Sequence, residues 1–102
     1  MSSNENNSSL PVNKTEASTP TFTCLVYLSK DDSGKSIARV ANLANLQATG
    51  ATPRDAMMRV CREFKEQVRG AYAAGEENAL PWIDPPKAPQ PGEQVRTIPV
   101  HL

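Results

Sequence analysis

The sequence has few of the residue types on which many enzymes and membrane proteins depend. Its 102 residues include one histidine, His101, and two cysteines, Cys24 and Cys61, and only 5% of the residues are aromatic. No apolar run approaches the roughly 18 residues of a membrane span. The start of the chain also lacks the basic and apolar regions of a signal peptide. We therefore expect a cytoplasmic protein with no metal site and no membrane association.

An excess of charge of one sign is also missing. The 11 Lys and Arg residues balance the 11 Asp and Glu residues, so the formal net charge is zero. A dedicated nucleic-acid-binding protein usually carries a basic excess that neutralises phosphates. The charge balance therefore disfavours that class, although it does not exclude a local basic stripe.

The apolar residues are few and unevenly distributed, which limits the size of the core. They make up 38% of the chain, below the roughly 45–50% of an average soluble domain. Residues 1–20 are rich in Ser, Asn and Thr, so we predict a disordered N-terminal tail there. Residues 21–102 then form a single domain. Its thin core favours assembly into a homodimer.

Three short strands are predicted in the first half of the domain. Apolar residues alternate from Thr21 until a turn over residues 29–35, and both faces of this first strand carry apolar side chains. The segment Asp31–Gly34 supplies the turn. A return strand follows at Ile37–Val40, and a third strand at Leu46–Thr49 ends at Gly50.

The strongest local signal is a helix that begins at Thr52. Thr52, Pro53 and Asp55 provide a hydroxyl cap, a proline at the first helical position and an acid in the first turn. Gly75 is the natural stop. The apolar residues that recur at spacings of three and four are Met57, Val60, Cys61, Phe64, Val68, Ala71 and Tyr72. They predict one buried stripe along an amphipathic helix.

The opposite face of this helix carries Arg62, Lys65 and Arg69, interleaved with Glu63 and Glu66. Mixed charges of this kind are typical of a solvated face. The alternative function for the three basic residues is contact with RNA.

A proline-rich arm follows the helix at residues 81–91. Prolines at this density favour an extended conformation. Trp82 and Ile83 are expected to pin the arm to the domain, and Trp82 serves either as a lid on the core or as a contact for a partner. Tyr27 is a further candidate partner contact, because it lies on the second apolar face of the first strand.

A last strand is predicted at Val95–Val100, with Pro99 indicating an edge position. The predicted fold is therefore α+β, in the order β-β-β-α-β. One long helix packs on one face of a three- to four-stranded, mostly antiparallel sheet.

No constellation for catalysis or cofactor binding is present in the sequence. Cys61 lies mid-stripe on the helix and is expected to be buried and reduced, as is Cys24. No two Cys or His residues have the spacing of metal ligands. Gly34 and Gly50 are isolated, so there is no phosphate-binding loop. We expect a protein without enzymatic activity, catalytic residues or cofactors.

The segment 37–56 combines a strand, a loop with Leu43, a short strand that reaches Gly50, and a helix start. This ordered combination resembles the central motif of HicB-type antitoxins, in which a "pdLpgc" loop precedes a Thr-Pro-x-(Glu/Asp)-Ala helix start. The matching positions are Leu43, Gly50, Thr52, Pro53, Asp55 and Ala56. With Leu80-Pro81 and the closing strand, the likeness covers about residues 22–102. Departures are Ala44-Asn45 in place of the loop's Pro-Gly, and Ala51 in place of an acid.

The resemblance implies a partial ribonuclease-H-like fold without a working active site. It further implies that the protein binds and neutralises a small, basic HicA-type RNA-cleaving toxin. The chain ends at Leu102 without the DNA-binding unit of many such antitoxins, so no direct DNA binding is expected. The leading hypothesis is a non-catalytic protein-binding module that dimerises through a sheet surface or edge. The alternatives are an RNA-binding accessory protein and a homo-oligomeric HicB-like protein without a toxin.

Overall fold

The computed structural model describes residues 20–102, and the tail predicted at 1–20 lies outside this range apart from Pro20. The order of elements confirms the predicted α+β fold. The elements are β1 (Thr21–Lys30), β2 (Ser36–Val40), β3 (Gln47–Gly50), α1 (Pro53–Ala73), the short 3-10 helix η2 (Glu77–Ala79) and β4 (Gln94–His101). Among these residues, no helix is both long and apolar enough to cross a membrane.

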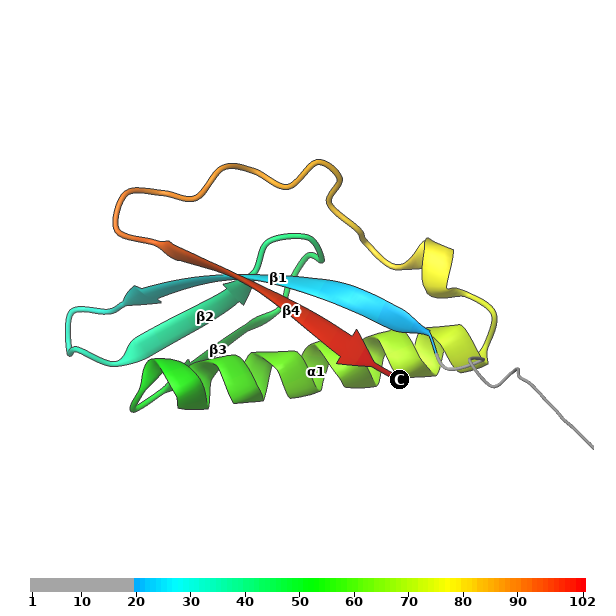
Figure 1. The fold of residues 1–102 in the computed structure, drawn as a ribbon, viewed down its shortest axis with the longest axis horizontal. Helices are drawn as coiled ribbons and strands as arrows, with labels where there is room; N and C mark the ends of the chain where they lie inside the picture. The colour runs from blue at the N-terminus through cyan, green and yellow to red at the C-terminus, as the bar shows by residue number, and fades with distance from the viewer. Residues whose placement is uncertain (1–19) are drawn as a thin grey trace, which may run out of the picture.

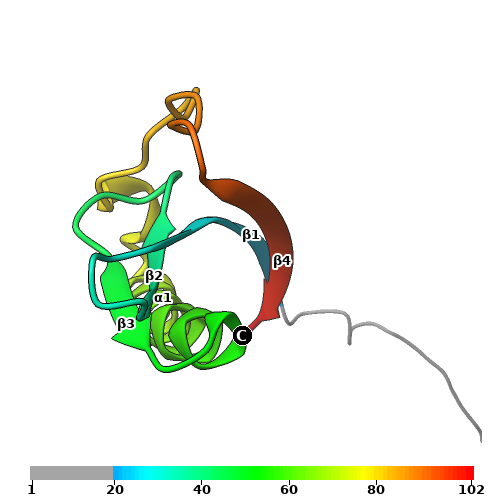
Figure 2. The ribbon, with the colours of Figure 1, turned by 90° about the vertical axis from the view of Figure 1, so that its left-hand side faces the viewer.

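The four strands form one sheet in the order β3-β2-β1-β4, and every neighbouring pair is antiparallel. The long helix packs on one face of this sheet (Figure 1). It lies mainly against β2 and β3, while β4 lies at the far side of the curled sheet (Figure 2). Among residues 20–102, the edge strands of this sheet are β3 and β4, and Pro99 lies on an edge strand as predicted.

The turn between β1 and β2 forms through the side chain of Asp31. Its carboxylate accepts hydrogen bonds from the backbone N–H and hydroxyl of Ser33 and from the N–H of Lys35. These hydrogen bonds lower the pKa of Asp31, and the bond from the Ser33 hydroxyl has the largest effect. Gly34 takes the positive φ of 87° that the turn requires. β1 extends to Lys30, further than its apolar alternation predicted, because its last residues still pair with β2.

Both ends of α1 follow the chemistry of their residues. The Thr52 hydroxyl accepts a hydrogen bond from the Asp55 N–H at 3.1 Å, and Pro53 opens the first turn. The helix ends at Ala73, and Gly75 takes a positive φ of 72° just beyond it. The predicted start and stop of the helix are thus confirmed.

The core lies between α1 and the sheet. On the helix it consists of Ala56, Val60, Phe64 and Val68, all fully buried. Met57, Cys61 and Ala71 are only half-buried, and Tyr72 is 43% exposed. The prediction that Cys61 is buried was therefore wrong. These residues lie at the margins of the apolar stripe or at its end, where the sheet no longer covers them.

The proline-rich arm crosses the face of the sheet opposite α1 (Figure 1). Tyr27 projects toward this arm from β1. Its side chain is only 4% exposed, and its hydroxyl donates to the carbonyl of Lys87 at 2.6 Å. The Arg39 guanidinium lies 4.9 Å from the centroid of the Tyr27 ring. The chain's own arm thus covers part of the second apolar face of β1.

A charged pair fixes the chain just after this arm. Arg39 on β2 donates two hydrogen bonds, of 2.8 and 2.9 Å, to the carboxylate of Glu93. The Glu93 side chain is only 7% exposed. The hydrogen bonds from Arg39 lower the pKa of Glu93. Paired carboxylates of this kind stabilise the folded state while they are ionised.

We predict that this pair makes stability depend on acid pH. Because the folded-state pKa of Glu93 is lowered, its stabilisation is complete above the ordinary glutamate pKa of about 4.3. It is lost as pH falls through the folded-state pKa. Between pH 7 and pH 3, wild-type protein should lose more free energy of unfolding than Glu93→Gln, measured by urea denaturation. The exposed Glu76→Gln variant is the control and should follow wild type. Equal losses in Glu93→Gln and wild type would contradict the assignment.

Candidate functional site

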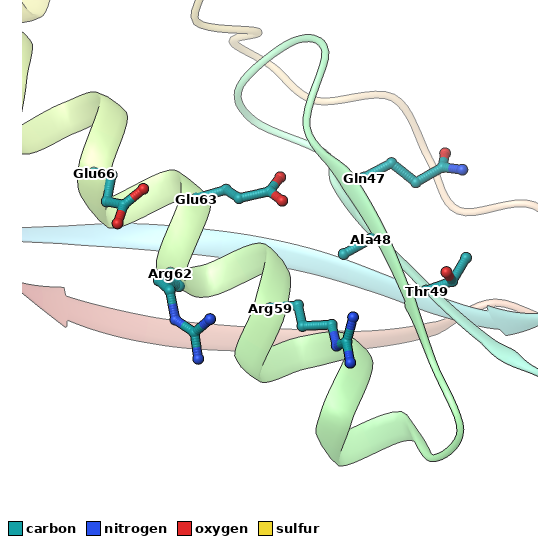
Figure 3. Close-up of a pocket in the computed structure, with 7 residues that line it drawn as sticks. All are labelled: Gln47, Ala48, Thr49, Arg59, Arg62, Glu63 and Glu66. Carbon is teal, nitrogen blue, oxygen red and sulfur yellow. The ribbon is translucent and has the colours of Figure 1, made fainter.

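A groove separates the edge strand β3 from the helix α1. Its volume is about 520 Å³. Figure 3 shows Arg59 and Glu63 projecting from the helix toward β3, while Ala48 points back toward the helix. The complete lining is Gln47, Ala48 and Thr49 on β3, and Arg59, Arg62, Glu63 and Glu66 on α1. The groove is open, and most of the side chains around it are polar or charged.

The backbone of β3 is available along the groove's outer side. The Val40 N–H donates to the carbonyl of Leu46, and Ala48 occupies the next hydrogen-bonded position toward β2. Hydrogen-bonded and non-hydrogen-bonded pairs alternate along an antiparallel ladder. Gln47 and Thr49, which are both exposed, therefore direct their N–H and C=O groups away from β2. An incoming strand can bind to these groups.

The opposite edge, β4, is less suited to strand addition. The Leu102 N–H donates to the carbonyl of Pro20, which fixes the alternation between β4 and β1. By that alternation, Pro99 belongs to the residues whose backbone groups point away from β1. Proline has no N–H, so it interrupts the outward row of donors. Natural sheets protect their edges in this way. β3 contains no proline.

The groove carries two positive and two negative side chains close together on α1. Arg59 and Glu63 are four residues apart, as are Arg62 and Glu66. Pairing within a helix is less favourable in this order than with the acid first. Over residues 20–102, the structure has only one side-chain ion pair, and it lies elsewhere, between Arg39 and Glu93. Within the part of the chain that the structure describes, the four groove charges therefore have no ion-pair partner.

Several motif residues hold the helix against β3. A Cβ atom placed on Gly50 would lie 2.7 Å from the Ala56 backbone nitrogen and 2.8 Å from the Asp55 Cβ. Gly50 is therefore needed for a close approach and not for an unusual φ. Ala56 is fully buried, and Thr52 and Pro53 begin the helix directly after this contact. Leu43 is also fully buried, in the core. These residues position the groove but do not line it.

None of the residues predicted to contact a partner lines the groove. Trp82 is half-buried. Its ring stacks on the Phe22 ring, with centroids 6.1 Å apart, and meets the Phe64 ring edge-on, also at 6.1 Å. The indole Nε1–H donates a hydrogen bond to the Glu77 carbonyl. Trp82 thus packs against the core. Because part of the Trp82 side chain remains exposed, contact between this residue and a partner stays a prediction.

Ile83 joins the arm to the loop after β2, since its N–H donates to the Asn42 carbonyl at 3.0 Å. Ile83, Trp82 and Leu25 line a second hollow of about 380 Å³ beneath the arm. Tyr27 does not line this hollow and faces the arm. The structure therefore brings Trp82 and Ile83 together and separates them from Tyr27.

The three basic residues considered for RNA contact divide between two positions. Arg62 lines the groove, whereas Lys65 and Arg69 lie outside its lining. Sequence reasoning missed Gln47, Thr49 and Arg59 as site residues. One signal in the sequence could have indicated the helix side of the site: Arg59 and Arg62 each precede a glutamate by four residues, so all four side chains share one helix face. The exposure of β3 had no such signal, because it depends on the order of strands in the sheet.

The two cysteines do not form a disulfide. Cys24 is buried on β1, and a hydrogen bond with Cys61 together with burial raises the pKa of its thiol. Among residues 20–102, no three His, Cys, Asp or Glu side chains gather where they could hold a metal ion.

In comparison with known proteins, the chain matches no family model, no curated protein and no solved structure. Its candidate site is therefore defined by its own geometry.

Proposed function

We propose that the protein is a non-catalytic module that binds another protein along the β3 edge and the adjoining groove. The observation that carries this proposal is the pair of exposed residues, Gln47 and Thr49, whose backbone N–H and C=O groups point outward from the edge strand, away from β2. An extended segment of a partner adds main-chain hydrogen bonds at such an edge. The groove charges beside the edge then select which partner binds, because charge complementarity contributes mainly to specificity.

The resemblance to HicB-type antitoxins supports a specific version of this function. In that version the partner is a small, basic HicA-type toxin, which the module neutralises by covering its surface. Glu63 and Glu66 provide acidic groups in the groove for such a basic partner. A homo-oligomeric HicB-like protein without a toxin is the second version, and its partner is another copy of the same chain.

The Thr49→Pro variant tests the proposed edge. Proline removes the outward N–H, a bond worth about 0.5–1.5 kcal/mol, and its ring occupies the space of the incoming strand. The N–H of Thr49 does not serve the pairing with β2, so the fold should be retained. Tagged protein is captured from its native host, and the eluate is quantified by mass spectrometry. We expect the amount of stoichiometric partner to fall roughly tenfold or more.

The matched control is Thr97→Pro, the same change on the opposite edge strand, which should capture the partner as wild type does. The tagged chain is expressed beside the untagged one, so the captured protein is a toxin in the first version and untagged copies of the chain in the second. Bait alone in every eluate, or equal capture by Thr49→Pro and wild type, would refute the proposed function.

An RNA-binding function has one observation in its favour. The helix carries Arg54, Arg59, Arg62, Lys65 and Arg69 against the three acids Asp55, Glu63 and Glu66, a local excess of two positive charges. RNA in the eluate supports this alternative if salt releases it and if replacement of Arg62, Lys65 and Arg69 by alanine abolishes it.

A further inference from the structure

We propose that the occupant of the β3 edge is a second copy of the chain, bound through a two-fold axis beside Ala48. This inference rests on the proposed function, because it names the partner at the same site. The resulting dimer has one continuous eight-stranded sheet, twice the four strands of one copy, with both helices on the same face. Its interface is isologous, so each residue that contacts the second copy is also contacted by its counterpart.

The strand register supports two-fold pairing. The outward residues Gln47 and Thr49 lie symmetrically on either side of Ala48. In an antiparallel pair centred there, Gln47 of one copy lies opposite Thr49 of the other. Opposed residues in this position exchange N–H and C=O bonds. This register uses every outward backbone group of β3, so no polar group is left unpaired when the edge is covered.

The groove charges have the same symmetry. A two-fold axis makes the helices of the two copies antiparallel. Centred between Arg62 and Glu63, it places Arg62 opposite Glu63 of the second copy. The next pair outward is then Arg59 with Glu66. Each positive group thus meets a negative group, and the long side chains can extend between the helices.

The outward strand residues and the helix charges border the same groove. The groove is lined by Ala48 and its two neighbours on the strand and by these four charged residues on the helix. Strand pairing at β3 therefore brings the charged helix face of one copy toward that of the other, because the helix charges lie beside this strand (Figure 3). A basic or acidic partner would satisfy only half of the charges, whereas a second copy satisfies all four. This charge complementarity favours a copy of the chain over other partners.

Charge reversal with compensation tests this arrangement. One variant carries Arg59→Glu and Arg62→Glu, and the other carries Glu63→Arg and Glu66→Arg. Each variant alone places four like charges of each copy against four of the other. Like charges opposed in an interface cost several kcal/mol, so the dimer dissociation constant should rise roughly a hundredfold or more. An equimolar mixture restores every opposite-sign pair, and it should form a heterodimer.

The measurement is sedimentation equilibrium of the full chain, with native mass spectrometry to identify the heterodimer. Wild type should have twice the monomer mass of 11.1 kDa. The matched control is Lys65→Glu with Arg69→Glu, which makes an equal charge change on the same helix outside the groove and should leave the dimer intact. Circular dichroism of each variant checks that the fold is kept. Thr49→Pro should be monomeric.

Three results would overturn the inference. These are a monomeric wild type, a dimer that both reversals leave intact, and a mixture that fails to restore the dimer although both variants are folded. The proposed function is judged separately, by capture. A monomeric wild type that still captures another protein through β3 refutes the second copy and leaves the binding module standing.

Discussion

Replacing Phe64 with alanine is expected to lower the free energy of unfolding by about 3–5 kcal/mol, the usual cost of removing a buried aromatic ring. The Phe64 side chain is 0% exposed and lies at the centre of α1's buried face. It also meets the Trp82 ring edge-on. Its removal therefore leaves a cavity and loosens the residue that attaches the arm to the core. Domains of this size have total stabilities of about 5–15 kcal/mol, so a substantial part of that stability should be lost.

Chemical denaturation at one fixed protein concentration measures this effect, with Trp82, the single tryptophan, as the fluorescent probe. Met58→Ala is the control, because Met58 lies on the same helix but is 53% exposed. That change should stay within about 0.5 kcal/mol of wild type. A Phe64→Ala variant as stable as Met58→Ala would show that the helix does not pack as described.

Replacing Gly50 with alanine is expected to destabilise the protein by about 1–3 kcal/mol or more, as overpacking does. The added Cβ would lie 2.7 Å from the Ala56 nitrogen and 3.0 Å from the Asp55 carbonyl carbon. Both are backbone atoms, so they cannot move aside as a flexible side chain would. To make room for the Cβ, β3 and the start of α1 must move apart, and this changes the shape of the groove. Binding at β3 should therefore weaken as stability falls.

Gly70→Ala provides the matched control for this prediction. Gly70 lies within α1, and a Cβ there would meet nothing within 4 Å. The same substitution should therefore stabilise the protein by about 0.5–1 kcal/mol, because alanine is the better helix former. Thermal unfolding should show opposite shifts for the two variants. A neutral Gly50→Ala would mean that the helix start lies further from β3.

The sequence was most informative where local chemistry decides the structure. Thr52 and Pro53 begin the helix, Asp31 and Gly34 form the turn, and Pro99 marks an edge, all as predicted. Each of these signals acts over a few residues. The predicted fold class follows from their order along the chain.

The arm and the groove could not be derived in this way. The contact of Tyr27 with Lys87 joins residues 60 apart in the sequence, and periodicity says nothing about such pairs. The apolar second face of β1 suggested a binding surface, but part of it is covered by the chain itself. The groove required the strand order, which places β3 at an edge next to α1.

The central position of β1 has a consequence for how the protein is made on the ribosome. β1 pairs on one side with β2, which follows it closely, and on the other side with β4, so that Thr21 meets His101 across 80 positions. The hairpin, β3 and the helix all precede β4 in the chain and contact one another without it. The edge of β1 that pairs with β4 stays unpaired until residues 94–101 have emerged, and apolar residues near it stay exposed. Late contacts of this kind slow folding and favour aggregation. A chain that lacks residues 94–101 is therefore expected to aggregate and to need a chaperone.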